Sequence, residues 1–376
     1  MNILLSGGGT AGHINPAIAI AETIQKHIPD ANLLFVGTPS GMESRLVPMA
    51  GFAYTSMPVA GFQRKLTLNN IKRNVQAVYY LARSGSRAAK IVRDFKPDLA
   101  IGTGGYVCGP ILRKAAQMGV PVLVHEANAF PGVTVKMLAS YCDCVMLAVE
   151  DARARMPQGT KVEITGNPVR AEVLAYDKRR AREELGVDDR PLIVSFGGSL
   201  GARTINESML DLLVRSAKDG RYQHIHGYGQ YGGFVLDRLK EKGVFLGSCP
   251  NLDVREYIND MPRVMAAADL VICRAGAMAL AELQALGKAA ILIPSPNVAE
   301  NHQFYNAMAL VNRGAAEIIE EKDISPALLT DKVDRLAGDR AKLDEMSENA
   351  RKMAILDSRE KIYEVVERTL RQHGKL

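Results

Sequence analysis

Short apolar runs alternate along this chain with longer stretches in which apolar residues recur at helical spacing. In the first half, the apolar runs predict strands at Ile3–Ser6, Leu33–Val36, Leu99–Gly102, Val122–Val124 and Cys144–Leu147. Amphipathic helices such as Ala17–His27 and Ile111–Gln117 are predicted between them. Strands that alternate with helices are typical of a parallel, doubly wound α/β sheet.

The same alternation starts again after residue 166. Gly166-Asn167-Pro168 forms a predicted turn and linker, and a charged helix is predicted over 177–188. Further strands are predicted at Leu192–Phe196, Gln223–His226, Leu270–Cys273 and Ala290–Ile293, and residues 320–373 read as helical throughout. The length of 376 residues and the repeated alternation therefore predict two Rossmann-like domains, over 1–165 and 166–353, that face each other across a cleft.

Three glycine-rich turns each follow a predicted strand and precede a predicted helix. They are Gly7–Gly12, Gly102–Pro110 and Gly197–Arg203. Glycine permits positive φ and close backbone approach, and the N–H groups at a helix start attract anions. One such loop can be turn chemistry alone, but three together favour a phosphorylated or polyoxygenated ligand.

A fourth segment, Arg274–Glu282, opens a helix with small residues and places a carboxylate on its second turn. Glu282 could accept hydrogen bonds from a ribose diol, and an exposed helical glutamate fits the pattern equally well. The chain has no G-x-x-x-x-G-K-[ST] segment, which excludes a P-loop. It also has no Asp-x-Asp pair, so we expect helix dipoles and side chains, without a metal or other cofactor, to stabilise a diphosphate.

Gly7–Gly12 also matches the G-x-G-x-x-G fingerprint of dinucleotide-binding proteins. That fingerprint requires an acidic residue at the end of the second strand, where this chain has Val36-Gly37-Thr38. A nicotinamide-dependent oxidoreductase is therefore the alternative from a different class of protein.

The net charge of +6 and the pI of about 9.0 indicate acidic partners. Residues 64–93 hold eight basic residues and no acidic one, and they contain an apolar stripe that could face a membrane or a core: Ile71, Val75, Val78 and Tyr79. The chain enters a strand at Ile3, which leaves no room for a signal peptide. We therefore expect peripheral attachment to an anionic membrane on its cytoplasmic side. No aromatic-rich basic stretch indicates nucleic acid, and five cysteines indicate neither disulfides nor a metal site.

In this order, the motifs resemble the undecaprenyl-diphospho-muramoylpentapeptide N-acetylglucosaminyltransferase family, GT-B glycosyltransferases of the family 28 type. The resemblance rests on Gly8–His13, Gly104–Val107, His125–Asn128, Gly166–Arg170, Gly197–Arg203, Arg274–Glu282 and His302–Ala307. It implies inverting transfer of N-acetylglucosamine from UDP-GlcNAc to the 4-hydroxyl of lipid I, the undecaprenyl-pyrophosphate-linked MurNAc-pentapeptide. The product would be lipid II, used in peptidoglycan synthesis, cell shape and cell division. A related glycolipid synthase and a nucleotide-sugar epimerase are the other candidates of similar architecture.

The resemblance implies a donor site in the C-terminal domain and an acceptor site in the N-terminal domain, to which the last helix, about 354–376, returns. UDP-GlcNAc contacts carry over to Thr10, Ala11, Gly12, Asn128, Arg170, Ser199, Asn206, Ile258, Arg274, Ala277, Met278, Ala279, Leu280, Ala281, Glu282 and Gln303. Acceptor contacts carry over to Gly104, Gly105 and Tyr106. Leu200 and Val135 depart from the family, since many members have glutamine and a polar residue at these positions.

An inverting displacement needs a base for the acceptor hydroxyl and stabilisation of the leaving UDP. His13, directly after the first glycine-rich turn, is the first candidate base, and Glu126 is the alternative. His13 could instead bind the acceptor without proton transfer, and Glu126 could be a structural carboxylate that holds its loop. His302 reads as a donor contact or a helix cap.

Overall fold

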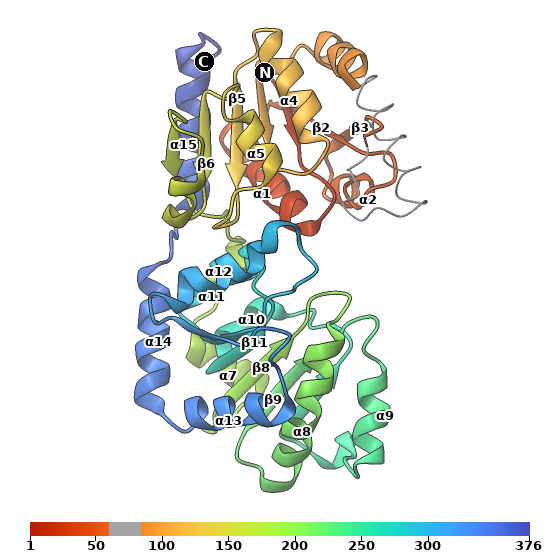
Figure 1. Ribbon diagram of the computed structural model, residues 1–376, viewed down its shortest axis with the longest axis vertical. Coiled ribbons are helices and arrows are strands. Elements are labelled where there is room, and N and C mark those ends of the chain that lie inside the picture. The colour runs from red at the N-terminus through yellow and green to blue at the C-terminus, as the bar shows by residue number, and fades with distance from the viewer. Residues whose placement is uncertain (60–83) are drawn as a thin grey trace. The chain divides into compact units, whose positions relative to one another are not determined.

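The computed structural model describes residues 1–59 and 84–376 and divides the chain into two compact units. Unit 1 comprises Met1–Pro168 and Ile355–Leu376, and unit 2 comprises Val169–Ala354. Each unit contains one sheet whose described strand pairs are all parallel, with helices packed around it (Figure 1). This confirms the predicted class of two doubly wound α/β domains. Lys72, Arg73 and the apolar stripe predicted near them lie outside the described residues.

Unit 1 has the strand order β3-β2-β1-β4-β5-β6-β7. The strands are β1 (Asn2–Ser6), β2 (Asn32–Gly37), β3 (Ala53–Ser56), β4 (Leu99–Gly102), β5 (Val122–Glu126), β6 (Cys144–Leu147) and β7 (Val162–Ile164). The labelled helices are α1 (Ala11–His27), α2 (Glu43–Met49), α4 (Cys108–Gln117), α5 (Val133–Leu138), the 3-10 helix η1 (Glu150–Arg155) and α15 (Ser358–Gln372). Residues 84–95 are also helical.

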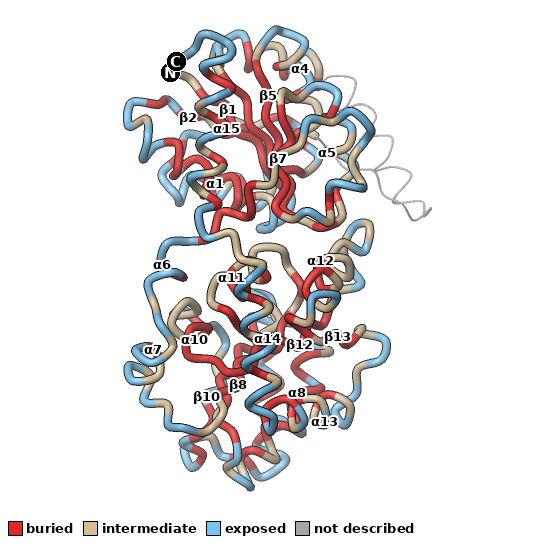
Figure 2. Tube along the Cα trace, turned by 90° about the vertical axis from the view of Figure 1, so that its left-hand side faces the viewer, coloured by how far each residue is buried: buried red, intermediate tan, exposed pale blue. Residues whose placement is uncertain are grey.

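Alternation along β1 distributes its side chains over two hydrophobic cores. Ile3 and Leu5 pack in a core with residues of α1 and α15, and Leu4 packs with residues of α4 and α5. This follows from the period of two in a strand, which sends successive side chains to opposite faces. The strands accordingly form the buried centre of the unit, shown in red in Figure 2.

The last helix completes the core of unit 1, although it is far from α1 in sequence. Ile362, Val366 and Leu370 of α15 are buried with residues of α1 and β1. At the edge of this contact the ring of Tyr363 stacks on His27, with ring centroids 3.9 Å apart. Burial of an apolar helix face stabilises the packing of α15 on α1.

Unit 2 has the strand order β10-β9-β8-β11-β12-β13. The strands are β8 (Leu192–Phe196), β9 (Gln223–Gly227), β10 (Leu252–Arg255), β11 (Leu270–Cys273), β12 (Ala289–Leu292) and β13 (Ala316–Ile318). The helices are α6 (Ala171–Leu174), α7 (Lys178–Leu185), α8 (Arg203–Asp219), α9 (Phe234–Glu241), η2 (Leu246–Ser248), α10 (Met261–Ala267), α11 (Ala277–Leu286), η3 (Ala299–Asn301), α12 (His302–Val311), α13 (Pro326–Ala337) and α14 (Arg340–Lys352).

The prediction of continuous helix over 320–373 is wrong. The segment forms three helices, α13, α14 and α15, and its first residues are not helical. The breaks have local causes, because the side chain of Ser325 caps α13 at Leu328 N and that of Asp339 caps α14 at Lys342 N. Residues of this kind begin helices, and helical periodicity alone does not show where one helix stops and the next starts.

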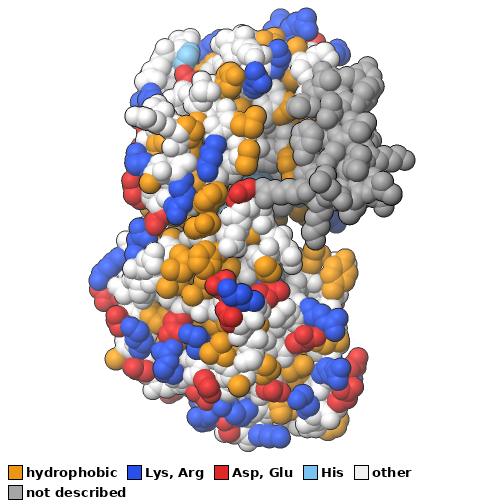
Figure 3. All heavy atoms as spheres, viewed as in Figure 1, with side chains coloured by type: hydrophobic (Ala, Val, Ile, Leu, Met, Phe, Trp, Pro, Cys, Tyr) orange, Lys and Arg blue, Asp and Glu red, His pale blue; other side chains and the backbone are white. Residues whose placement is uncertain are grey.

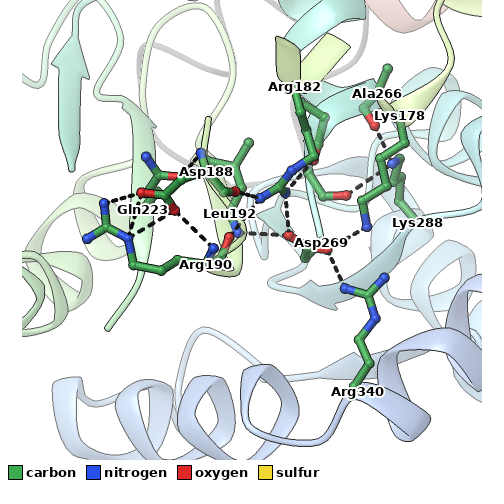
Figure 4. Close-up of polar contacts among 12 residues, drawn as sticks. Lys178, Arg182, Asp188, Arg190, Leu192, Gln223, Ala266, Asp269, Lys288 and Arg340 are labelled. Atoms are coloured by element: carbon green, nitrogen blue, oxygen red, sulfur yellow. Dashed lines mark hydrogen bonds and ion pairs between the residues drawn. The ribbon is translucent and has the colours of Figure 1, made fainter. Parts of the chain in front are cut away.

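A buried carboxylate ties several elements together at the amino-terminal edge of the sheet in unit 2 (Figure 4). Asp269 precedes β11 and accepts hydrogen bonds from Lys178, Arg182 and Arg340 at 2.5, 2.7 and 3.0 Å, and from Leu192 N at 2.8 Å. The network therefore fastens α7 and α14 to β8 and β11 at the edge opposite the glycine-rich loops.

Two buried histidines on β9 predict that acid destabilises unit 2. His224 and His226 hydrogen-bond Ser216 and Ser195, and burial lowers their pKa values to about 3 and about 4. Unfolded histidine titrates near 6.5, so between pH 6.5 and 4 the folded chain binds fewer protons than the unfolded chain. The free energy of unfolding should therefore fall as the pH is lowered, by about 1.4 kcal/mol per pH unit for each histidine.

His226→Gln should weaken this pH dependence, because glutamine does not titrate. Urea unfolding between pH 6.5 and 5 tests it, followed by tyrosine fluorescence because the chain has no tryptophan. Equal pH slopes in the variant and the wild type would contradict the prediction.

Candidate functional site

In each unit, the glycine-rich turns and the small-residue segment Arg274–Glu282 lie where the strand order reverses. β1 has β2 on one side and β4 on the other, and β8 lies likewise between β9 and β11. The loops that follow β1 and β4, and those that follow β8 and β11, therefore leave the sheet toward opposite faces. Parallel α/β sheets bind their ligands in the crevice at this reversal.

In unit 1, His13 lies on the first turn of α1 and is held by the loop after β4. Its Nδ1 is 2.9 Å from the carbonyl oxygen of Thr103, and Thr103 Oγ1 donates to the carbonyl oxygen of His13 at 2.6 Å. A carbonyl oxygen can only accept, so Nδ1 carries the proton and Nε2 keeps the lone pair. Burial lowers the pKa of His13, opposed by the bond to Thr103. The imidazole is therefore neutral near pH 7, as a general base must be.

Close backbone packing brings the loops after β1 and β4 together. Gly104 and Gly105 have φ of 108° and 91°, which favour glycine. A Cβ on Gly104 would lie 2.6 Å from His13 Nδ1, and one on Gly105 would lie 2.3 Å from the carbonyl oxygen of Gly8. Only glycine fits at either position. Tyr106 follows them with 60% of its surface exposed, and Thr10, Ala11 and Gly12 are also exposed.

Glu126 uses both carboxylate oxygens to hold the loop that follows β5. One oxygen accepts from the backbone N–H and the side-chain amide of Asn128, each at 2.9 Å, and the other accepts from Gly132 N at 2.8 Å. Glu126 is buried. This geometry favours the loop-holding interpretation of Glu126 over the role of base.

Two predicted motifs in unit 1 pack against each other. The buried ring of His125 contacts the carbonyl oxygen of Gly166 through Nε2 at 2.9 Å, and Asn167 donates to the carbonyl oxygen of Ala127 at 3.1 Å. Burial lowers the pKa of His125 to about 4, so this histidine is neutral. The two motifs His125–Asn128 and Gly166–Asn167 therefore hold two neighbouring loops together.

In unit 2, Glu282 and Arg170 form an ion pair. Nε and Nη2 of Arg170 each lie 2.9 Å from Glu282 Oε1. Glu282 is buried on α11, and burial raises the pKa of its carboxyl group, opposed by the charge and hydrogen bond of Arg170. The arrangement brings together two residues that lie far apart in sequence and that were both predicted to bind the nucleotide sugar.

Helix α11 starts with small residues at the reversal point of unit 2. Its N-cap is Gly276, which has no side chain to cap the helix, and Ala277, Met278, Ala279 and Ala281 are partly exposed, while Leu280 is buried. The positive end of the helix dipole lies here. A diphosphate is the kind of group that this helix start can bind.

Backbone contacts join the loops after β8 and β9. Gln230 N and Tyr231 N donate to the carbonyl oxygens of Ser199 and Leu200, each at 3.1 Å. Ser199 and Leu200 are exposed, with 57% of Leu200 accessible. Asn206 is buried below them and donates to the carbonyl oxygen of Tyr228 at 2.8 Å. Asn206 therefore supports the loop pair, and a direct ligand contact by its side chain stays a prediction.

The remaining residues predicted to contact UDP-GlcNAc lie at the same edge of the sheet and contact neighbouring loops. Ile258 is buried below Gly227, and Gln303 accepts from Ser295 N at 2.9 Å. Arg274 donates to the carbonyl oxygens of Ile293 and Pro294 and pairs with Glu321. His302, the first residue of α12, contacts the carbonyl oxygen of Ala299 through Nδ1 at 2.8 Å, and its contact with the nucleotide sugar stays a prediction. Arg274 is thus a clamp between loops.

Sequence reasoning missed Glu43, a fully buried carboxylate of α2 that bonds the first glycine-rich loop at Gly9. Its segment, Thr38–Glu43, looks like an ordinary polar turn, so the sequence carried no signal for burial.

Two family models together match most of the chain. The glycosyltransferase family 28 N-terminal domain matches residues 3–147, and the glycosyltransferase family 28 C-terminal domain matches residues 192–364.

Curated proteins and solved structures of similar sequence extend this match to nearly the full length. A "UDP-N-acetylglucosamine--N-acetylmuramyl-(pentapeptide) pyrophosphoryl-undecaprenol N-acetylglucosamine transferase" of Acetivibrio thermocellus is 46% identical over 97% of each chain. A protein of the same name, numbered 1, from Bacillus cereus is 39% identical over 99% of this chain and all of its own. The crystal structure of Acinetobacter baumannii MurG superimposes with a TM-score of 0.75 at 27% identity, over 98% of this chain and 99% of that one.

Proposed function

The chain belongs to glycosyltransferase family 28, and from that premise we propose that it transfers N-acetylglucosamine from UDP-GlcNAc to the 4-hydroxyl of lipid I, giving lipid II. The observation that carries this proposal is the 46% identity, over 97% of each chain, to a transferase whose name states the same donor and the same lipid-linked acceptor. The protein is an N-acetylglucosaminyltransferase of peptidoglycan synthesis.

Unit 2 is the proposed donor unit. The start of α11 supports a diphosphate site, and the Arg170–Glu282 pair supports a ribose site, because a carboxylate can accept both hydroxyls of a diol. Leaving UDP gains negative charge in the transition state, which the dipole of α11 stabilises. The acceptor is proposed to contact Gly104, Gly105 and Tyr106 of unit 1.

His13 is the proposed base. Its Nε2 lone pair takes the proton of the acceptor 4-hydroxyl while the oxygen attacks the anomeric carbon and the bond to UDP breaks. The Thr103 carbonyl fixes the tautomer and ring orientation that this step needs.

Transfer from labelled UDP-GlcNAc to a lipid I analogue tests the proposal, with UDP-galactose and UDP-glucose as competitors. Labelled product that appears only with acceptor is expected. Conversion of the UDP-sugar without acceptor would favour an epimerase, transfer to diacylglycerol would favour a glycolipid synthase, and tight NADH binding would favour an oxidoreductase.

We further propose that unit 1 binds the cytoplasmic face of an anionic membrane. No helix in 1–59 or 84–376 is long and apolar enough to cross a bilayer. On the visible face of unit 1, apolar side chains lie among Lys and Arg side chains (Figure 3). Val133 and Met137 of α5 are 56% and 64% exposed, and Arg113 and Lys136 lie over the rings of Tyr141 and Phe130. Apolar residues flanked by basic ones suit an anionic lipid surface.

Arg113→Glu together with Lys136→Glu should weaken vesicle binding. At about 1 kcal/mol per basic residue, the loss is roughly thirtyfold in partition coefficient at low salt. Sedimentation with vesicles that contain phosphatidylglycerol measures it. Lys218→Glu with Lys322→Glu changes the net charge equally in unit 2 and is the matched control. Equal loss in both double variants would contradict a membrane face at α4 and α5.

A further inference from the structure

Glu43 is a buried carboxylate bonded by neutral donors from two loops. None of its surface is exposed. One oxygen accepts from Gly9 N at 3.1 Å, and the other accepts from Thr38 N at 2.9 Å and Thr38 Oγ1 at 2.6 Å. The carboxylate therefore joins the glycine-rich loop after β1 to the loop after β2.

Among the described residues, neutral hydrogen-bond donors stabilise the charge of Glu43. No lysine, arginine or histidine of the described chain forms an ion pair with it. Burial alone would raise the pKa of Glu43, but the hydrogen bonds from Thr38 and Gly9 outweigh burial and hold the pKa below its usual range. An ionised carboxylate fits these contacts because it only accepts hydrogen bonds, and the backbone N–H groups of Gly9 and Thr38 only donate. The Thr38 hydroxyl accepts from Gly41 N at 3.1 Å, which leaves its proton for Glu43.

Three glycines are packed so closely on Glu43 that no side chain fits. A Cβ on Gly8 or Gly41 would lie 2.8 or 2.3 Å from Oε1, and one on Gly37 would lie 2.5 Å from Cγ. Tyr54 braces the same loop, since its hydroxyl donates to the carbonyl oxygen of Thr38 at 2.6 Å. The loops are thus built around the carboxylate.

Three contacts lead from Glu43 to His13. Gly8, packed on the carboxylate, donates through its N–H to the carbonyl oxygen of Gly104 at 3.3 Å. Thr103, one residue before Gly104, supplies the carbonyl oxygen that His13 Nδ1 contacts. These contacts link the position of Gly8 to the carbonyl group that orients His13.

We propose that Glu43 is a positioning residue for sugar transfer. It fixes the glycine-rich loop after β1 against the loop after β2 and, through the bond between Gly8 and Gly104, keeps Thr103 where it orients the ring of His13. This inference rests on the proposed function and on His13 as its base. Glu43 itself touches neither substrate, because it is fully buried.

Glu43→Gln tests the inference, since glutamine keeps the shape but turns an NH₂ group toward donors of Gly9 or Thr38. Transfer to a lipid I analogue should show kcat lowered about tenfold, as for one lost hydrogen bond to a charged group, with the Kd for UDP unchanged. The bond to Thr103 raises the pKa of His13. Its weakening should therefore move the acidic limb of the kcat–pH profile to lower pH.

Asp98→Asn is the matched control. Asp98 directly precedes β4 and so lies at the opposite, amino-terminal edge of the same sheet. It accepts a hydrogen bond from Asn2 N at 2.9 Å and forms an ion pair with Lys375. Asp98→Asn should lower the melting temperature without changing kcat or the pH profile. Tyr54→Phe is a milder second variant, expected to change kcat and the acidic limb in the same direction as Glu43→Gln.

If Glu43→Gln folds and its kcat and pH profile equal those of the wild type, the inference is overturned. An equal kcat loss in Asp98→Asn would overturn it too, because stability alone would then explain the effect. If Glu43→Gln does not fold, Tyr54→Phe is the deciding variant, and an unchanged kcat and acidic limb in Tyr54→Phe would overturn the inference. Absence of transfer by the wild-type enzyme would instead refute the proposed function.

Discussion

Replacing His13 with alanine should lower kcat about 10²- to 10⁴-fold while the Kd for UDP stays nearly unchanged, the size usual for loss of a general base. His13→Gln keeps a polar side chain near Thr103 but cannot take up the proton, so it should be almost as slow. Steady-state transfer to a lipid I analogue at saturating acceptor, with UDP calorimetry alongside, measures both. In the wild type, kcat should fall as the pH drops below 6.5, because burial lowers the pKa of His13 and protonation removes the lone pair.

His27→Gln provides the control on the same helix. His27 is the last residue of α1, stacked on Tyr363. Its substitution should leave kcat and the acidic limb unchanged. Retention of most wild-type kcat by His13→Gln would show that His13 only positions the acceptor, and Glu126 would then be the next candidate despite its loop contacts.

Replacing Glu282 with alanine should weaken UDP binding by about 1.5–3 kcal/mol, the range for hydrogen bonds to a charged group. That corresponds to roughly ten- to over a hundredfold in Kd. The substitution removes the proposed ribose acceptor and also leaves Arg170 without the carboxylate that it pairs with. Isothermal titration calorimetry with UDP measures the loss.

Glu317→Gln separates this effect from a general loss of carboxylate pairing in unit 2. Glu317 lies on β13 and pairs with Lys332 at 2.6 Å and with Arg335. It should reduce stability and leave UDP affinity unchanged. UDP binding by Glu282→Ala as tight as by the wild type would rule out the ribose role.

The central strands could be predicted from the sequence, and the four edge strands could not. β4, β6, β8 and β11 have the predicted bounds because each is a mostly apolar run whose residues are nearly all buried. No strand was predicted at β3, β7, β10 or β13, which lie at sheet edges. Their residues are mixed and partly exposed, since an edge strand has one neighbour and needs fewer apolar side chains.

For the site, the sequence located loops better than side-chain directions. The three glycine-rich turns do follow β1, β4 and β8, because glycine is required where backbones approach closely. Asn206 and Arg274 illustrate the limit, since both bond carbonyl groups of neighbouring loops. Loop contacts of this kind depend on tertiary packing. Glu43 could not be found in the sequence for the same reason.

The return of α15 to unit 1 has a consequence for biosynthesis. Ile362, Val366 and Leu370 belong to the same core as Ile3 and Leu5, yet all of unit 2 lies between them in the chain. On the ribosome, unit 2 can complete its core while α1 still lacks its helical partner. The amino-terminal unit should therefore finish folding last, and a nascent chain arrested before residue 358 should expose the apolar face of α1 to chaperones.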